Sequence, residues 1–134
     1  MINVVLDTNV LVSGLLSATG KPSQIVNAFK DKCFILFYSD EILAEYSDVL
    51  FRERLGLNHE DVNNLLEEIS KIGILITPDI SNIPMSDEDD RVFYDVAKCC
   101  NAYLVTGNTK HYPYEPHILT PAQFIEMFEK RTYT

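Results

Sequence analysis

The sequence lacks several features that would place the chain in other protein classes. It has no apolar run near the roughly 20 residues that cross a membrane, so we expect no membrane span. No basic stretch or cleavage site marks a secretory signal, so we expect the mature protein to begin at Met1 and to be cytoplasmic. The three cysteines, Cys33, Cys99 and Cys100, show no C-x-x-C spacing. We expect reduced, partly buried thiols and no cysteine metal site.

Basic residues are also scarce. The chain has 11 Lys and Arg residues against 20 Asp and Glu residues, a formal net charge of −9 at pH 7. This balance argues against unaided, nonspecific binding to nucleic acid, which normally requires a basic surface. An acidic protein can still act on a polyanion if its carboxylates hold divalent cations, or if a basic partner supplies the missing charge.

The chain does contain a regular alternation of strand-like and helix-like segments. Its 134 residues include no linker, repeat or low-complexity tract, so we assign 1–134 to a single domain. Apolar runs that alternate with amphipathic stretches predict an α/β fold with a parallel sheet covered on both faces. The predicted strands are Ile2–Leu6, Cys33–Tyr38, Ile74–Thr77, Tyr103–Thr106 and His117–Leu119.

Caps and periodicity predict the helices between these strands. They are expected to begin just after Asn9, at about Pro22, at Ser39 or Asp40, after the cap Asn58, at Ser86, and at Thr120–Pro121. Ser86 and Asp89 resemble a capping box, although Asp replaces the usual Glu or Gln. The helix that follows, to Cys100, is expected to bury Val92, Phe93, Val96, Ala97, Cys99 and Cys100, and to turn Arg91, Asp95 and Lys98 to solvent.

The first candidate for chemistry is Asp7. It ends the buried strand Ile2–Leu6, and Thr8 and Asn9 follow it. A bare carboxylate at the end of a buried strand is costly unless something compensates for it. The carboxyl ends of strands in open α/β sheets are also where ligands bind.

Two helices each place a carboxylate beside their buried face. Helical phase puts Glu45 at the edge of the apolar face of its helix, and Asp90 at the edge of another. The alternative for Glu45 is an ordinary solvated helix charge. The neighbours of Asp90, at 87–89, suit the positive end of the helix that they precede, where they would act as caps.

A fourth candidate follows another strand end. Asn108 lies in TGNTKH, just past the strand Tyr103–Thr106, although a plain turn residue is the alternative there. Together Asp7, Glu45, Asp90 and Asn108 would supply several oxygen ligands around one cleft. Like charges at close range resist simultaneous ionisation, and a bound Mg²⁺ or Mn²⁺ removes that penalty. Such a site suits metal-assisted hydrolysis of a phosphodiester.

Three blocks in this order resemble the PIN-domain family, and specifically the toxin components of prokaryotic toxin–antitoxin pairs. The blocks are VVLDTNVLVSGLL, SDEILAEYSDVLFR and DEDDRVFYDVAKCCNAYLVTGNTKHYP. Residue by residue, the acidic ligands of the family fall on Asp7, Glu45 and Asp90. The fourth acidic position of many relatives falls on Asn108, and the supporting polar positions fall on Thr8, Asn9 and Thr106.

The resemblance implies a fold, an activity and partners. The fold would be a three-layer α/β/α sandwich around a five-stranded parallel sheet. The activity would be that of an endoribonuclease that uses Mg²⁺ or Mn²⁺ and acts on an RNA substrate. The resemblance further implies a homodimer, inhibited by a co-encoded antitoxin whose tail blocks the cleft.

Asn108 and the acidic surface also motivate a different function. A degenerate PIN module would act by binding protein or RNA, with little or no catalysis. The neutral amide should weaken a second metal most, which favours one tightly bound cation. A haloacid-dehalogenase-like phosphatase is the third possibility, but Asn9 stands where its second Asp is needed.

Other polar residues near the last strands have less specific roles. Arg52, Arg54, Lys110 and His111 could meet phosphates, and we expect His111 to be a structural or surface residue rather than a general base. Tyr112 and Tyr114 are either base-stacking groups or, more often in such loops, anchors of the loop.

Overall fold

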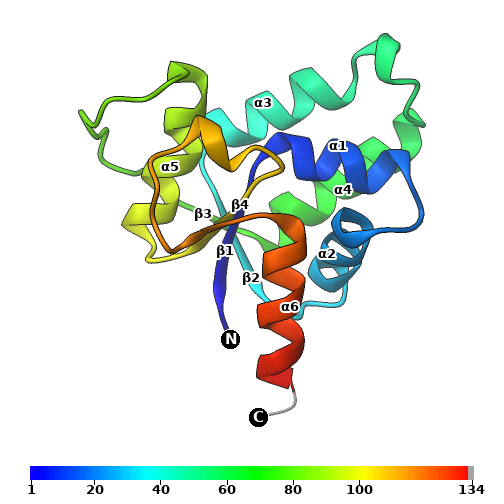
Figure 1. Cartoon of the computed structure of the whole chain (residues 1–134). Helices are drawn as coiled ribbons and strands as arrows, with labels where there is room; N and C mark the ends of the chain where they lie inside the picture. The colour runs from blue at the N-terminus through cyan, green and yellow to red at the C-terminus, as the bar shows by residue number, and fades with distance from the viewer. Residues whose placement is uncertain (133–134) are drawn as a thin grey trace.

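The computed structural model describes residues 1–132 and has a central five-stranded parallel sheet (Figure 1). The strands follow the order β3-β2-β1-β4-β5. Their bounds are Asn3–Leu6 for β1, Ile35–Tyr38 for β2, Ile74–Leu75 for β3, Tyr103–Val105 for β4 and Ile118–Leu119 for β5. The strands thus lie within or match the predicted segments, and the two outermost are only two residues long.

Helices cover both sides of the sheet, which confirms the three-layer arrangement (Figure 1). Their bounds are Thr8–Leu16 for α1, Lys21–Lys30 for α2, Asp40–Leu50 for α3, His59–Ile72 for α4, Arg91–Cys99 for α5 and Pro121–Thr132 for α6. Helix α5 packs against β1, β2 and β4, while α2, α4 and α6 lie on the opposite side. None of the helices within residues 1–132 has both the length and the apolar character that a membrane crossing requires.

The central strand explains why the sheet forms. Val4, Val5 and Leu6 of β1 are fully buried, as expected for a strand covered on both faces. β1 pairs with β2 on one side and with β4 on the other. The carboxyl ends of these three strands therefore lie at one edge of the sheet, where the predicted site residues follow them.

Local caps fix the helices that border this edge. Ser39 accepts a hydrogen bond from the backbone N–H of Ile42 and so caps α3. Thr120 and Gln123 bond to each other's backbone N–H groups, which makes a capping box for α6. Helix α1 begins at Thr8, with Asp7 as its N-cap residue, two residues before the predicted start.

The start of α5 differs from the prediction. Asp87, not Ser86, provides the side-chain cap, by accepting a 3.0 Å hydrogen bond from the N–H of Asp89. A short 3-10 helix, η2 (Glu88–Asp90), follows before α5 begins at Arg91. The capping role expected of the 87–89 acids is therefore filled by Asp87.

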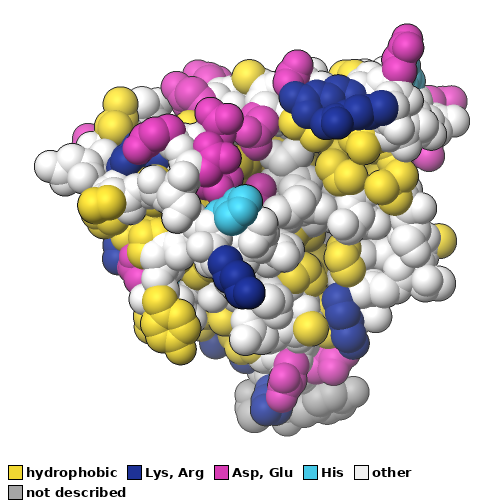
Figure 2. All heavy atoms as spheres, turned by 45° about the horizontal axis from the view of Figure 1, so that its top comes forward, with side chains coloured by type: hydrophobic (Ala, Val, Ile, Leu, Met, Phe, Trp, Pro, Cys, Tyr) yellow, Lys and Arg dark blue, Asp and Glu magenta, His cyan; other side chains and the backbone are white. Residues whose placement is uncertain are grey.

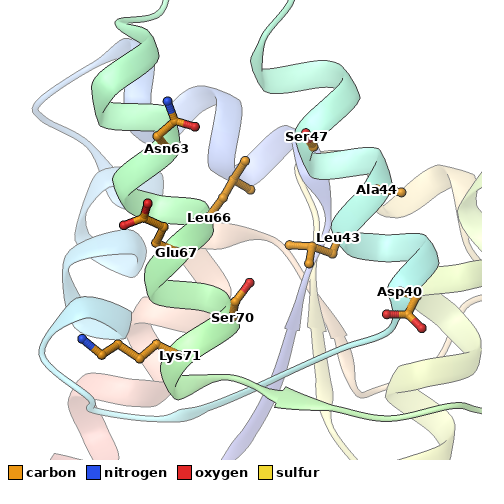
Figure 3. Close-up of a pocket in the computed structure, with 9 residues that line it drawn as sticks. All are labelled: Asp40, Leu43, Ala44, Ser47, Asn63, Leu66, Glu67, Ser70 and Lys71. Atoms are coloured by element: carbon orange, nitrogen blue, oxygen red, sulfur yellow. The ribbon is translucent and has the colours of Figure 1, made fainter.

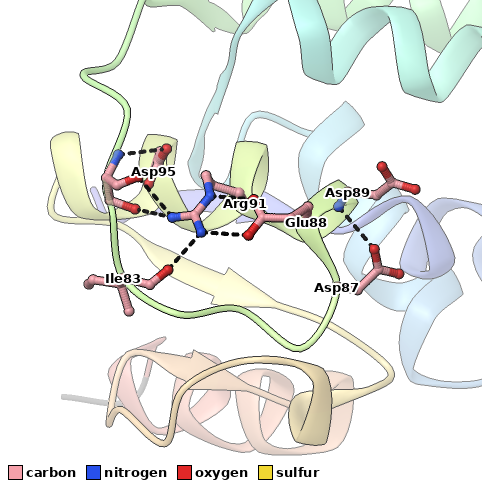
Figure 4. A network of polar contacts seen from close by, with 7 residues as sticks. Ile83, Asp87, Glu88, Asp89, Arg91 and Asp95 are labelled. Carbon is pink, nitrogen blue, oxygen red and sulfur yellow. Dashed lines mark hydrogen bonds and ion pairs between the residues drawn. The ribbon is translucent and has the colours of Figure 1, made fainter.

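The orientation predicted for two residues of α5 was wrong. Asp95 is buried and accepts a hydrogen bond from the N–H of Ser81, and Arg91 donates to Ser81 and Ile83 (Figure 4). The cause is the irregular segment 76–87, which runs over this face of α5 and shields it from solvent. Lys98 is exposed as expected.

The cysteines are free, as predicted, but less buried than expected. Cys33 and Cys99 are exposed and only Cys100 is partly buried. Cys99, which helical phase had placed on the buried face, is the last residue of α5.

Candidate active site

Asp7 is held at the end of β1 by two hydroxyl groups. Its side chain is 7% exposed. The hydroxyl of Thr106 donates to Oδ2 at 2.9 Å, and the phenol of Tyr112 donates to the same oxygen at 2.8 Å. Neither donor uses Oδ1. The two bonds therefore fix the carboxylate and leave its second oxygen for another partner.

Glu45 reaches the same edge from α3, as its helical phase predicted. Thr8, the first residue of α1, donates its hydroxyl hydrogen to Oε2 of Glu45 at 2.5 Å. Burial raises the pKa of Glu45, the bond from Thr8 opposes that rise, and the charges of Asp7 and Asp89 add to it. The Glu45 carboxylate is thus held in place by Thr8 and is close enough to Asp7 for the two charges to interact.

Asp90 has a strongly raised pKa and a buried carboxylate oxygen. Burial raises its pKa to about 6, and the charges of Asp7 and Asp87 contribute to the rise, while His111 opposes it. Its Oδ2 is buried without a hydrogen-bond partner among residues 1–132, and the nearest ring nitrogen of His111 lies 3.5 Å away. A buried carboxylate oxygen in this state is costly unless a cation reaches it.

Asn108 is connected to Asp90 by His111, which contacts both side chains. Its side-chain nitrogen and Nε2 of His111 are 2.9 Å apart, and its backbone N–H donates to the hydroxyl of Thr106. His111 therefore contacts both predicted ligands, Asp90 and Asn108. These contacts suit the structural one of the two roles that we expected for His111.

Thr106 and Asn9 connect these parts of the site. The Thr106 side chain is fully buried, and its hydroxyl accepts from the side-chain amide of Asn9 while it donates to Asp7. Asn9 in turn accepts a hydrogen bond from the N–H of Gly107 at 2.9 Å. Both residues join the turn after β4 to the start of α1.

The structure brings the predicted residues to one place without a finished metal cluster. The charge of Asp7 raises the pKa values of both Glu45 and Asp90, and the charge of Glu45 adds to the rise at Asp90, which requires that the three lie close together. Figure 2 shows acidic side chains gathered at this end of the molecule beside a histidine. Across residues 1–132, however, no three His, Cys, Asp or Glu side chains already stand in the arrangement of a metal site.

Sequence reasoning offered Tyr112 as a loop anchor but missed its contact with Asp7, which completes the site. It is buried at 6% exposure, and burial together with the charges of Asp7 and Asp90 holds the pKa of its phenol far above the ordinary range. Tyr112 is thus neutral and acts as a hydrogen-bond donor, which matches the anchoring alternative and not base stacking. Its neighbour Tyr114 is fully exposed.

A groove beside α3 is separate from these residues. It has a volume of about 630 Å³ and lies between α3 and α4, with Leu43 and Leu66 facing each other across it (Figure 3). None of Asp7, Glu45, Asp90 or Asn108 lines it. The carboxylate edge remains the candidate active site.

Comparison with known proteins identifies the family of this site. Residues 3–110 match the family model described as PIN domain. The chain belongs to the PIN domain family. The matched range contains all the site residues that the resemblance implied, from Asp7 to Asn108. Members of the family are generally nucleases, which are hydrolases, and PIN nucleases typically use divalent metals.

One relative matches this PIN domain over nearly its whole length. It is Uncharacterized protein MJ1680 from Methanocaldococcus jannaschii, 30% identical over 145 residues. The match covers 96% of this chain and 93% of the relative. The name of the relative assigns no activity.

Proposed function

We propose that this PIN domain is an endoribonuclease that depends on Mg²⁺ or Mn²⁺ and serves as the toxin of a toxin–antitoxin pair. The observation that carries the catalytic part is the meeting of three carboxylates, Asp7, Glu45 and Asp90, at the carboxyl edge of the sheet. Their mutual repulsion costs folding energy that a bound divalent cation would recover.

The donor atoms suit a hard cation. Carboxylate and amide oxygens are the ligands that Mg²⁺ and Mn²⁺ prefer. The buried Oδ2 of Asp90 has no hydrogen-bond partner, and the two donors on Asp7 leave Oδ1 unused. Asp7, Glu45 and Asp90, with the amide oxygen of Asn108, would hold the ion.

The surrounding residues would keep these ligands in place during the reaction. Thr106 and Tyr112 orient Asp7, and Thr8 orients Glu45. A divalent cation bound there lowers the pKa of an attacking water and neutralises charge on the scissile phosphate. His111 would hold the side chain of Asn108 through the 2.9 Å contact between them.

RNA is the substrate that the toxin resemblance favours. The net charge of −9 gives the surface little attraction for a polyanion, so affinity for RNA would depend on the bound cation. In this proposal the chain is a homodimer, and a co-encoded antitoxin covers the carboxylate edge until it is degraded. A short neighbouring reading frame with a DNA-binding N-terminal part would support the antitoxin.

Cleavage of single-stranded RNA with and without Mn²⁺ tests the catalytic part. We expect cleavage only with the metal, and its loss in Asp7→Asn. Asp31→Asn is the matched control because Asp31 is exposed at the end of α2 and touches none of the site residues. Cleavage that persists in Asp7→Asn, or that needs no metal, would contradict the proposal.

A non-catalytic binding module is the second candidate function. The neutral Asn108 at a position that is acidic in many relatives favours it, as does the absence of a ready-made metal cluster within residues 1–132. RNA binding without cleavage across several RNAs and both metals would support the module. Growth arrest on expression that Asp7→Asn relieves would support the toxin instead.

A further inference from the structure

A small pocket adjoins the carboxylate edge on the side of Asn108. Its volume is about 250 Å³, below the roughly 300 Å³ where pockets for drug-sized ligands begin, so it suits one ring system. It lies between α1, the turn after β4 and the first turns of α2 and α6. The residues that matter here are Asn9, Ser13, Pro22, Gly107, Asn108 and Pro121.

The pocket has apolar walls and uncharged polar groups. Pro22 and Pro121 contribute apolar pyrrolidine rings, and the side chains of Asn9 and Ser13 add an amide and a hydroxyl. No lining residue is charged, which makes the pocket a poor site for a phosphate and a good one for a neutral ring. Amide and hydroxyl side chains are groups that hydrogen-bond the edges of nucleobases.

The pocket is held in shape by the same bonds that support the site. The Asn9 amide is fixed between the N–H of Gly107 and the hydroxyl of Thr106. A Cβ atom at Gly107 would lie 3.3 Å from Oδ1 of Asn9, so glycine permits this close approach. The hydroxyl of Ser13 is exposed on α1, and no side-chain hydrogen bond engages it within residues 1–132.

Asn108 links the pocket to the carboxylates. It lines the pocket and contacts His111, which in turn contacts Asp90. A nucleotide with its phosphate at the carboxylates could therefore place its base in this pocket. We propose that the pocket binds the base beside the scissile phosphate and gives cleavage a sequence preference. This inference rests on the proposed nuclease function.

Mapping the cleavage sites in a single-stranded RNA with randomised positions tests the proposal. We expect about a tenfold preference for one base at one position next to the cleaved bond. Ser13→Leu would fill the pocket and remove most of that preference, with Mn²⁺ affinity unchanged. Ser70→Leu is the control, because Ser70 is exposed on α4, outside the pocket. A preference absent from the native protein, or retained in Ser13→Leu, would overturn the inference.

A titration that needs no catalysis separates this inference from the proposed function. The four ribonucleoside 5′-monophosphates are added to the native protein with Mg²⁺, and the backbone N–H signals of Ser13 and Gly107 are followed by NMR. We expect at least one nucleotide to shift both signals, and not to do so in Ser13→Leu. If a nucleotide shifts both NMR signals but the protein cleaves no RNA, the base-binding pocket is supported and the proposed nuclease function is rejected. If no nucleotide shifts either signal, the pocket proposal is rejected whether or not RNA is cleaved.

Discussion

The phenol of Tyr112 donates a 2.8 Å hydrogen bond to Oδ2 of Asp7, although 105 residues separate the two along the chain. Asp7 ends the central strand, and Tyr112 follows the short 3-10 helix after β4. The bond therefore connects the loop after β4, which carries Tyr112, to the end of β1. With the bond from Thr106, it decides which oxygen of Asp7 faces a ligand.

Removal of this hydroxyl should weaken metal binding more than it weakens the fold. In Tyr112→Phe, Asp7 keeps only the bond from Thr106 and can rotate. Loss of a hydrogen bond to a charged group costs about 1.5 kcal/mol of stability, and we expect Mn²⁺ affinity to fall about tenfold. Titration calorimetry measures the affinity and urea unfolding measures the stability. Tyr114→Phe is the control, because Tyr114 is fully exposed. Lower stability with unchanged affinity would reduce Tyr112 to a structural role.

The three carboxylates were predictable because each lies in a local pattern. Asp7 ends an apolar strand, and the helical phases of Glu45 and Asp90 place them at the edge of a buried face. Local periodicity is enough for such residues, since β1 and α3 formed where expected and Asp90 directly precedes the first residue of α5.

Tyr112, by contrast, follows a turn without periodicity. Its contact with Asp7 depends on the pairing of β1 with β4, which no short segment encodes. The same limit explains Asp95 and Arg91. Helical phase alone put them in solvent, because the irregular segment that covers them has no pattern to predict its path.

Glu45→Gln should lower metal affinity and leave the fold intact. The amide retains an oxygen that can accept the hydrogen bond from Thr8, but the negative charge is lost. We expect at least about a tenfold loss of Mn²⁺ affinity by calorimetry, with thermal stability of the metal-free protein unchanged or slightly higher. Glu41→Gln, on the exposed side of the same helix, should bind Mn²⁺ like the native protein. Equal affinities in the two variants would remove Glu45 from the site.

Asp90→Asn should stabilise the metal-free protein at pH 7. The pKa of Asp90 is about 6 in the fold against an ordinary value of 3.8, so the folded state binds more protons between these values. The free energy of unfolding therefore falls as the pH rises from 3.8 to about 6 and Asp90 ionises. At pH 7 the whole destabilisation by the charged carboxylate is present. Removing the charge should raise the melting temperature by about 3 °C, and the gain should vanish below the ordinary pKa.

Scanning calorimetry in EDTA, at pH 7 and in acid, measures this difference between the native protein and Asp90→Asn. Asp31→Asn is the control, because Asp31 is exposed at the end of α2, away from the site residues. The same protonation predicts that Mn²⁺ affinity of the native protein falls as pH drops through about 6. An Asp90→Asn variant that is less stable than the native protein at pH 7 would show that the carboxylate is compensated without a cation.

Asn108→Asp should strengthen metal binding at the cost of the metal-free fold. The change adds a fourth carboxylate to the site, where the buried Oδ2 of Asp90 already lacks a hydrogen-bond partner within residues 1–132. Without metal, the added repulsion should lower the melting temperature at pH 7. With metal, greater ligand charge should raise Mn²⁺ affinity about tenfold, and a second bound equivalent should appear in calorimetry. Asn64→Asp, on the exposed face of α4, controls for net charge alone. If both variants bind Mn²⁺ with native affinity and stoichiometry, Asn108 does not face the cation.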